Sequence, residues 1–219
     1  MTKLQELSLG WFDLVVAIVL VVGLIRGKRR GLSQELLDVF KWLLIVVAGA
    51  HFYQPLGSVL TANTRVAGLL ASLTSYVLIF LSVTLLFAFV KRAVGKKLLG
   101  SDIFGSLEYY VGMAAGMVRY ACVTLVFLAL LHAPYISEEK LRATAKMQEE
   151  NFGSISFPTF GSVQQEVFTR SLSGKFVAEK LDSQLIAKTA WVGFDPGDDR
   201  LARRKENLID EVISGRPSR

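Results

Sequence analysis

Long apolar runs dominate the first 133 residues of the chain. Residues 66–90 contain no charged side chain, and residues 9–25 are interrupted only by Asp13. Residues 36–53 and 109–133 form two further runs. A helix of about 20 apolar residues spans the hydrocarbon core of a bilayer, so these runs predict about four membrane crossings.

The alternative is a soluble protein in which these runs are core helices. Four such runs within about 130 residues would leave too little polar face for that. Even the weakest run, residues 36–53, contains Trp42 and Tyr53 as markers of a membrane interface. We therefore predict an all-α fold class, a polytopic membrane protein with about four transmembrane helices. Residues 1–135 would form the transmembrane domain, and residues 136–219 a soluble tail, helical and partly disordered.

Charge is divided unevenly between these two parts. Up to residue 133 there are 12 Lys/Arg and 6 Asp/Glu, whereas the remainder has 13 of each, so the net charge of +6 belongs to the apolar part. A pI near 9.5 would suit nucleic-acid binding. Basic residues between apolar runs instead indicate membrane topology and contact with anionic lipid headgroups. We therefore expect no nucleic-acid partner.

The basic connections predict the orientation in the membrane, because Lys and Arg resist translocation. The connections 26–35 and 91–108 carry four basic residues each, whereas the connection around residues 54–65 has only Arg65. We expect the first two connections to be cytoplasmic and both termini to lie outside, which is the periplasm in a Gram-negative cell. The N-terminal run is interpreted as a retained anchor, since Asp13 interrupts it and a basic cluster follows.

The tail has a helical pattern of its own. Ser137 followed by two glutamates is typical of a helix start. Apolar residues then recur at helical spacing over about residues 163–190, as in an amphipathic helix that Ser173-Gly174 could interrupt. This stripe could pack on the membrane surface, on the membrane helices, on a partner or within the tail. A turn at residues 195–198 and a short polar helix complete the pattern.

Asp13 and Arg119 are charged residues inside the first and fourth apolar runs, where an unpaired charge is costly. Arg119 would be about 15 Å deep if its helix begins at Tyr109, or about 9 Å deep if it begins at Met113, and then it could reach the interface. Asp13 lies in the first turns of its helix, where the helix dipole stabilises a carboxylate. We expect Asp13 and Arg119 not to pair, and a proton-relay role for Asp13 is the less favoured interpretation.

Two short patterns indicate helix contacts. Glu35, Asp38 and Lys41 are spaced by three and share a helix face, on which Asp38 and Lys41 can pair. They form either a solvated rim or a contact with the basic connections. Gly112 and Gly116 form a GxxxG motif, which lets another helix approach closely. That helix belongs either to the same chain or to a second copy.

No arrangement of reactive residues predicts an enzyme. The chain lacks a Walker phosphate loop, and His51 and His132 are its only histidines, 81 positions apart. The single cysteine, Cys122, lies in an apolar run, and the acids of residues 195–199 lack the spacing of a calcium loop. We therefore expect no catalytic residues, no bound cofactor and no metal.

The order of several motifs resembles the colicin V production protein family. An acid opens the first run, a basic residue and a glycine precede an acid and a tryptophan at the second, and an acid, two glycines and a basic residue mark the fourth. The matching residues are Asp13, Arg30, Gly31, Glu35, Trp42, Glu108, Gly112, Gly116 and Arg119. The similarity covers about residues 10–133. Glu108 and Tyr109 depart from it, since the family often has Asp and then a basic residue there.

The resemblance implies a four-span bacterial inner-membrane protein linked to colicin V production or export and to cell-envelope physiology. It brings no catalytic residues, and its motif residues have no assigned role. The partners we expect are the lipid bilayer and, in the membrane, other proteins or further copies of the chain. A non-enzymatic scaffold is the leading interpretation. The second is a small channel or transporter subunit with Arg119 and Asp13 along a polar path, and the third is a membrane enzyme.

Overall fold

The computed structural model describes residues 10–63, 68–98, 107–153 and 157–190. Four long helices come first: α1 (Trp11–Arg30), α2 (Leu32–Asn63), α3 (Leu69–Leu98) and α4 (Leu107–His132). The tail follows with β1 (Pro134–Tyr135), α5 (Glu138–Phe152), α6 (Phe160–Thr169), α7 (Leu172–Lys180), a 3-10 turn η1 (Asp182–Gln184) and β2 (Thr189–Ala190). The expectations for Arg65, the turn at 195–198 and the polar helix after it lie outside the described residues.

Length and composition mark three helices as membrane spans. These are α2, α3 as far as Ala93, and α4. Helix α1 adds 20 residues, about 30 Å of helix, and packs along α4. The predicted fold class, an all-α membrane protein with long apolar helices and a helical tail, is confirmed.

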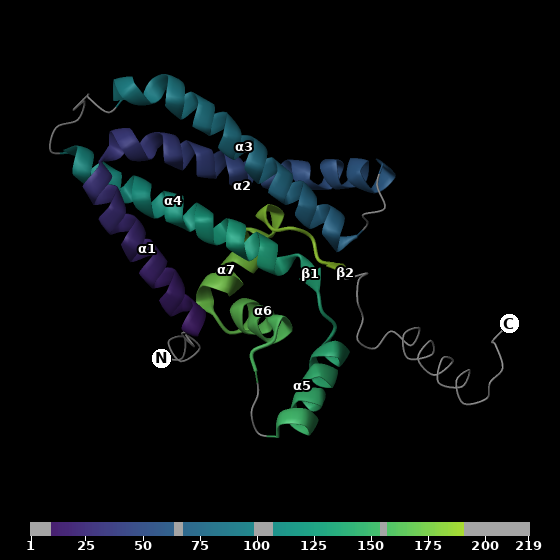
Figure 1. The fold of residues 1–219 in the computed structure, drawn as a ribbon. Coiled ribbons are helices and arrows are strands. Elements are labelled where there is room, and N and C mark those ends of the chain that lie inside the picture. Colours follow the sequence, from purple (N-terminus) through teal and green to yellow (C-terminus); the bar gives the residue numbers. More distant parts are fainter. Residues whose placement is uncertain (1–9, 64–67, 99–106, 154–156, 191–219) are drawn as a thin grey trace, which may run out of the picture.

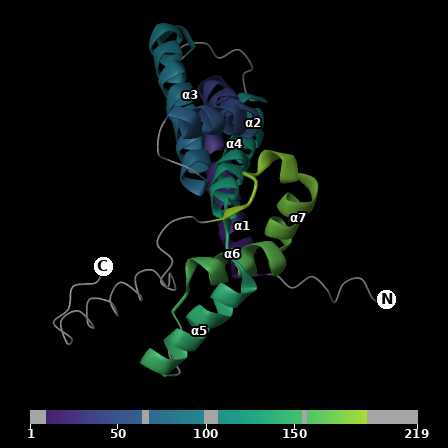
Figure 2. The same cartoon turned by 90° about the vertical axis from the view of Figure 1, so that its right-hand side faces the viewer.

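The four long helices form an open row rather than a closed bundle. Helix α4 lies between α1 and α2, and α2 lies between α4 and α3 (Figure 1). After a quarter turn, α3 again lies on the outer side of α2, and the tail helices α5 and α6 lie below the long helices (Figure 2). Both edge helices therefore have one well-packed neighbour each, and a large part of their surface is left to the hydrocarbon.

The exposed and buried side chains agree with a lipid environment. On the edge helices Leu14 is 65% exposed and Phe89 is 71% exposed, values that are unfavourable in water for side chains of this size. The middle of the row is closely packed, with Ile45 of α2 and Leu128 of α4 fully buried. The described helices thus bury a narrow core along their contacts and present apolar surface on their other sides.

A glycine sets the separation between α2 and α3. Gly49 of α2 faces the ring of Tyr76, and a Cβ at this position would lie 2.6 Å from a ring carbon. Tyr76 is 2% exposed as a result. The hydrogen at Gly49 is therefore what lets a large aromatic side chain fit between the two helices.

The first helix of the tail begins as predicted, but the amphipathic helix expected after it is divided into two. Ser137 caps α5 by accepting a hydrogen bond from the Lys140 N–H at 3.3 Å, which confirms the expected helix start. The apolar stripe expected over 163–190 lies on two helices, α6 and α7, followed by η1. The helix is interrupted at Arg170 and Ser171 and not at Ser173-Gly174, which lie inside α7. Ser171 begins α7 by accepting a hydrogen bond from the Gly174 N–H at 2.9 Å.

Candidate functional site

Glycines bring α1 and α4 into backbone contact. Gly112 and Gly116 of α4 face Gly23 and Gly27 of α1, and a Cβ at Gly27 would overlap the carbonyl oxygen of Gly112. A Cβ at Gly116 would overlap the carbonyl oxygen of Gly23 in the same way. The partner of the GxxxG motif is therefore a helix of the same chain. The sequence carried a matching signal that was missed, since Gly23, Gly27 and Gly31 also recur every four residues.

The turn between α1 and α2 is a single residue that only glycine suits. Gly31 has a φ of +74°, and a Cβ there would lie 2.9 Å from Oε1 of Glu108. That carboxylate is 8% exposed and accepts a hydrogen bond from the Ser33 N–H at 3.3 Å, at the start of α2. Glu108 of α4 therefore binds the positive end of the α2 dipole. The family-motif residues Gly31 and Glu108 form one contact.

Glu35 is buried and paired from two sides. It is 1% exposed, in the first turn of α2. Its Oε2 lies 2.6 Å from the Arg119 guanidinium of α4, and its Oε1 lies 3.5 Å from Arg30 at the end of α1. A charge-assisted bond of this length is strong, and the pairing offsets part of the cost of burying the carboxylate.

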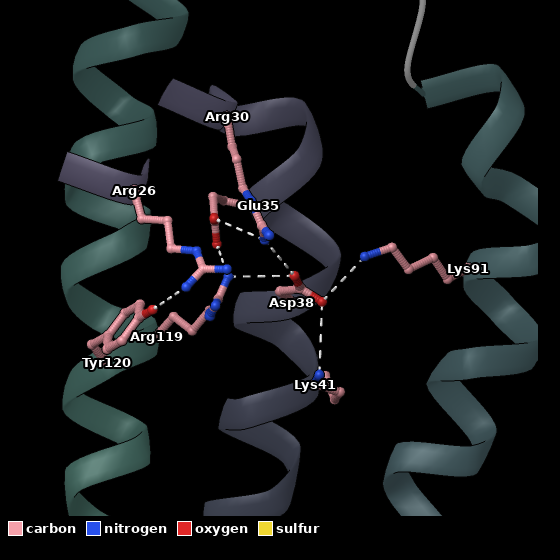
Figure 3. A network of polar contacts seen from close by, with 8 residues as sticks. All are labelled: Arg26, Arg30, Glu35, Asp38, Lys41, Lys91, Arg119 and Tyr120. Atoms are coloured by element: carbon pink, nitrogen blue, oxygen red, sulfur yellow. Dashed lines mark hydrogen bonds and ion pairs between the residues drawn. The ribbon is translucent and has the colours of Figure 1, made fainter. Parts of the chain in front are cut away.

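Asp38 joins the same network one turn further along α2. Its Oδ2 lies 3.4 Å from Arg119 and 3.5 Å from Arg30, and its Oδ1 lies 3.7 Å from both Lys41 and Lys91 (Figure 3). The predicted pair of Asp38 and Lys41 is confirmed. Together with Glu35, these residues form an ion-pair cluster that draws on all four long helices.

The cluster answers the open question about the acidic face of α2. A solvated rim was one interpretation and a contact with the basic connections was the other. The structure shows the second, because Arg30 and Lys91 reach the carboxylates from the ends of α1 and α3. Asp38 is 14% exposed, so the face is partly shielded from solvent.

Arg119 is both buried and directed toward the basic end of the row. Helix α4 begins at Leu107, so the backbone of Arg119 lies about 18 Å along it. Its guanidinium nevertheless reaches Glu35 and Asp38 in the first two turns of α2. The side chain is 13% exposed. The backbone of Arg119 therefore lies deep along α4, while its long side chain extends back to carboxylates near the start of α2.

Aromatic residues surround the cluster. The Arg119 guanidinium carbon lies 5.1 Å from the ring centre of Tyr120, whose hydroxyl oxygen accepts a long 3.5 Å hydrogen bond from Arg26 (Figure 3). Trp42 packs on Phe80 of α3 with ring centres 5.8 Å apart. The family-motif tryptophan therefore contributes to the α2–α3 contact.

Asp13 lies at the opposite end of the row of long helices, away from Arg119. Its Oδ2 accepts hydrogen bonds from the N–H groups of Gly10 at 2.9 Å and Leu172 at 3.0 Å. Its Oδ1 accepts from the Ser173 N–H at 2.8 Å and also from the Ser173 hydroxyl. One carboxylate thus caps both α1 and α7. The helix dipole explains why Asp13 caps α1. Its contact with α7 joins residues 159 positions apart, and no sequence pattern predicted it.

The described tail packs on this end of the row. The Ala187 N–H donates to the Tyr53 hydroxyl at 3.0 Å, and the buried His132 donates from Nδ1 to the Ile186 carbonyl at 2.9 Å. Gln164 of α6 donates to the Leu131 carbonyl at 2.9 Å, and β1 pairs with β2 in parallel. Of the surfaces considered for the apolar stripe, the described residues contact two: the membrane helices, and the tail itself, where Gly174 of α7 lies against Val167 of α6.

In the part of the chain that the structure describes, no three His, Cys, Asp or Glu side chains are grouped closely enough to hold one ion. His51 bonds its own helix at the Val47 carbonyl, whereas His132 is buried against the tail. Cys122 is also buried. His132 and Cys122 are therefore packing groups, whereas His51 is exposed on α2.

The fold and the site define a multi-pass α-helical membrane protein with an ion-pair cluster at one end and a docked tail at the other. The family model for colicin V production protein matches residues 12–150. This match covers more than half of the chain and extends from α1 into α5, so the chain belongs to the colicin V production protein family. No curated protein and no solved structure matches it.

Proposed function

We propose that this chain is a non-enzymatic scaffold of the bacterial inner membrane that supports colicin V production or export and cell-envelope maintenance. Membership of the family supports the biological setting. The geometry supports the scaffold, because the polar groups in the long helices are used to hold elements together. Residues 1–135 act in this proposal as the membrane domain and residues 136–219 as the polar tail.

The observation that carries the proposal is the use made of the acidic residues. In the described part of α1 to α4, each carboxylate binds an element other than its own helix. Asp13 binds α7, Glu35 binds α4, Asp38 binds α3 and α4, and Glu108 binds α2. Carboxylates committed in this way stabilise one arrangement of helices, which suits a platform for partners more than a site of chemistry.

The tail adds a second platform surface in the same proposal. It packs on the first turn of α1 through Asp13, on α2 through Tyr53 and on the last turn of α4 through His132. We place this end in the periplasm and the ion-pair cluster at the cytoplasmic face, since exposed Lys28 and Arg29 end α1 and exposed Lys91 and Arg92 lie on α3 beside the cluster.

A channel or transporter subunit is the second candidate. The row of four helices is open, so several copies would have to assemble to enclose a path through the membrane. The cluster would then be a charged constriction at the mouth of that path. The favouring observation is the surplus of positive charge around Glu35 and Asp38, where four cationic side chains meet two carboxylates.

Reversing the charge at Arg119 distinguishes a scaffold from a channel subunit. Arg119→Glu places a third carboxylate against Glu35 and Asp38, so a scaffold loses its fold and its crosslinked partners in native membranes. A pore instead retains assembly and changes its ion selectivity in planar bilayers. Lys28→Glu, an exposed reversal on the same face, is the matched control. Retained partner crosslinks together with altered conductance in Arg119→Glu would overturn the scaffold.

A further inference from the structure

The ion-pair cluster contains more cationic side chains than carboxylates. Glu35 and Asp38 carry two negative charges, and four cationic side chains converge on them: Arg30, Lys41, Lys91 and Arg119. Exposure rises outward, from 13% at Arg119 to 58% at Lys91. The excess positive charge therefore lies at the surface of the protein.

Lys41 and Lys91 approach the same oxygen from two helices. Both ammonium groups lie 3.7 Å from Oδ1 of Asp38, one from α2 and one from α3 (Figure 3). An ammonium group has three N–H donors, and Asp38 takes only part of this capacity. The two neighbouring cations thus form a clamp with donors left for a further anion.

The clamp lies where a bilayer has its headgroups. The apolar run of α3 ends at residue 90, directly before Lys91, and Lys91, Arg92 and two further lysines follow within residues 91–98. On the membrane side of the clamp, Leu44 of α2, one turn after Lys41, is 40% exposed, and Phe87 and Ala88 of α3, one turn before Lys91, are half-buried and exposed, respectively. A cationic clamp above an exposed apolar surface matches the two parts of a phospholipid.

We propose that Lys41 and Lys91, with Arg30 beside them, bind the phosphate of an anionic phospholipid whose acyl chains lie along α3. An anionic headgroup such as a phosphatidylglycerol neutralises the excess charge of the cluster. A zwitterionic headgroup brings its own cation, so it is the weaker ligand. The site depends only on the membrane location of the chain and not on the proposed scaffold role.

Native mass spectrometry of the full-length protein in detergent tests this site. Phosphatidylglycerol and phosphatidylcholine of matched chains are titrated into wild type, Lys41→Gln/Lys91→Gln and the control Lys28→Gln/Arg29→Gln, which removes the same charge from exposed positions on α1. We expect wild type to prefer phosphatidylglycerol and the clamp variant to lose about fivefold in affinity for each lysine removed. The control keeps most of its affinity.

Several outcomes would overturn the site. Equal losses in the two double variants would mean that attraction is spread over the whole basic surface. Displacement of the lipid by millimolar inorganic phosphate, with no preference between the two lipids, would mean that the clamp takes a free anion. Lys41→Arg/Lys91→Arg should bind like wild type and controls for folding. If the double Gln variant fails to fold, Lys91→Gln alone, at the most exposed cation, gives the decisive measurement.

Discussion

At the scale of single residues, burial decides which charges matter. The pair of Glu35 and Arg119 is shielded on both sides, with side chains 1% and 13% exposed. The pair of Glu138 and Arg142 on α5 has the same chemistry but is 80% and 83% exposed. A buried carboxylate that loses its partner keeps its desolvation cost, whereas an exposed one regains water. The two pairs therefore differ in what their removal costs.

Glu35→Gln is expected to destabilise the protein by about 3 kcal/mol, because Arg119 loses its shortest bond and stays buried. The measurement is the free energy of unfolding in detergent micelles. Glu138→Gln, the exposed control, should change it by less than about 1 kcal/mol. Adding Arg119→Gln to Glu35→Gln should recover part of the loss; strictly additive effects would mean that the two side chains are not coupled.

At the scale of elements, a glycine sets a helix separation only where a Cβ would overlap a group of the neighbouring helix. Gly27 of α1 meets the carbonyl of Gly112, and any side chain there must push α4 away. At Gly57 of α2 a Cβ would lie 3.5 Å from its nearest neighbour, Oγ of Ser75, which is an ordinary contact. The four-residue spacing of Gly23, Gly27 and Gly31 marks Gly27 in the sequence, and the packing shows what each of the two glycines faces.

Gly27→Ala and Gly57→Ala should therefore act in opposite directions. The first is expected to lower the free energy of unfolding by about 2 kcal/mol through overpacking. The second should be neutral or stabilising by up to about 1 kcal/mol, since alanine favours helix. Thermal unfolding of both variants in the same detergent checks this. Equal effects would contradict the α1–α4 contact.

The cap that Asp13 provides links two elements far apart in sequence. Asp13→Ala removes the acceptor of the Leu172 and Ser173 N–H groups, so α7 should detach from α1 while the long helices stay folded. Hydrogen exchange of the amides in residues 171–177 should speed up by about tenfold or more, as expected for the loss of a cap and its charge.

Glu179→Ala, at an exposed position on the same helix, is the control for this change and should leave exchange unaltered. Unchanged exchange in Asp13→Ala would show that the contacts of Tyr53 and His132 alone hold the tail in place.

At the scale of the whole molecule, two ends with different chemistry define a polarity. The ends of α1 and α3 bring the basic residues together, and the tail covers the other end. Single-cysteine labelling checks the sidedness, after replacing the buried Cys122 with Ala.

A cysteine at the exposed Ala145 of α5 should react with a membrane-impermeant maleimide in intact spheroplasts. One at the exposed Lys28 should react only after the membrane is opened. Reaction of Lys28→Cys from outside would keep the spans and reverse the orientation.

The sequence by itself determined where the chain meets hydrocarbon. A bilayer accepts only segments whose backbone is internally bonded and whose side chains are apolar, and this rule is local. For the same reason the cap at Ser137 and the pair of Asp38 and Lys41 could be predicted, since each involves residues within one helical turn. The family motifs followed from the same local pattern, although their roles did not.

Only the tertiary structure decided which helices are neighbours and what the intramembrane charges bind. A GxxxG motif permits close approach without naming the partner, so the pairing of Gly112 with Gly27 depended on the order of the whole row. Arg119 and Glu35 are 84 positions apart, and Asp13 and Leu172 are 159 apart. A buried charge or N–H group without a partner costs free energy. Each such group therefore pairs with a group that the folded helices bring close to it, whatever their separation in the sequence.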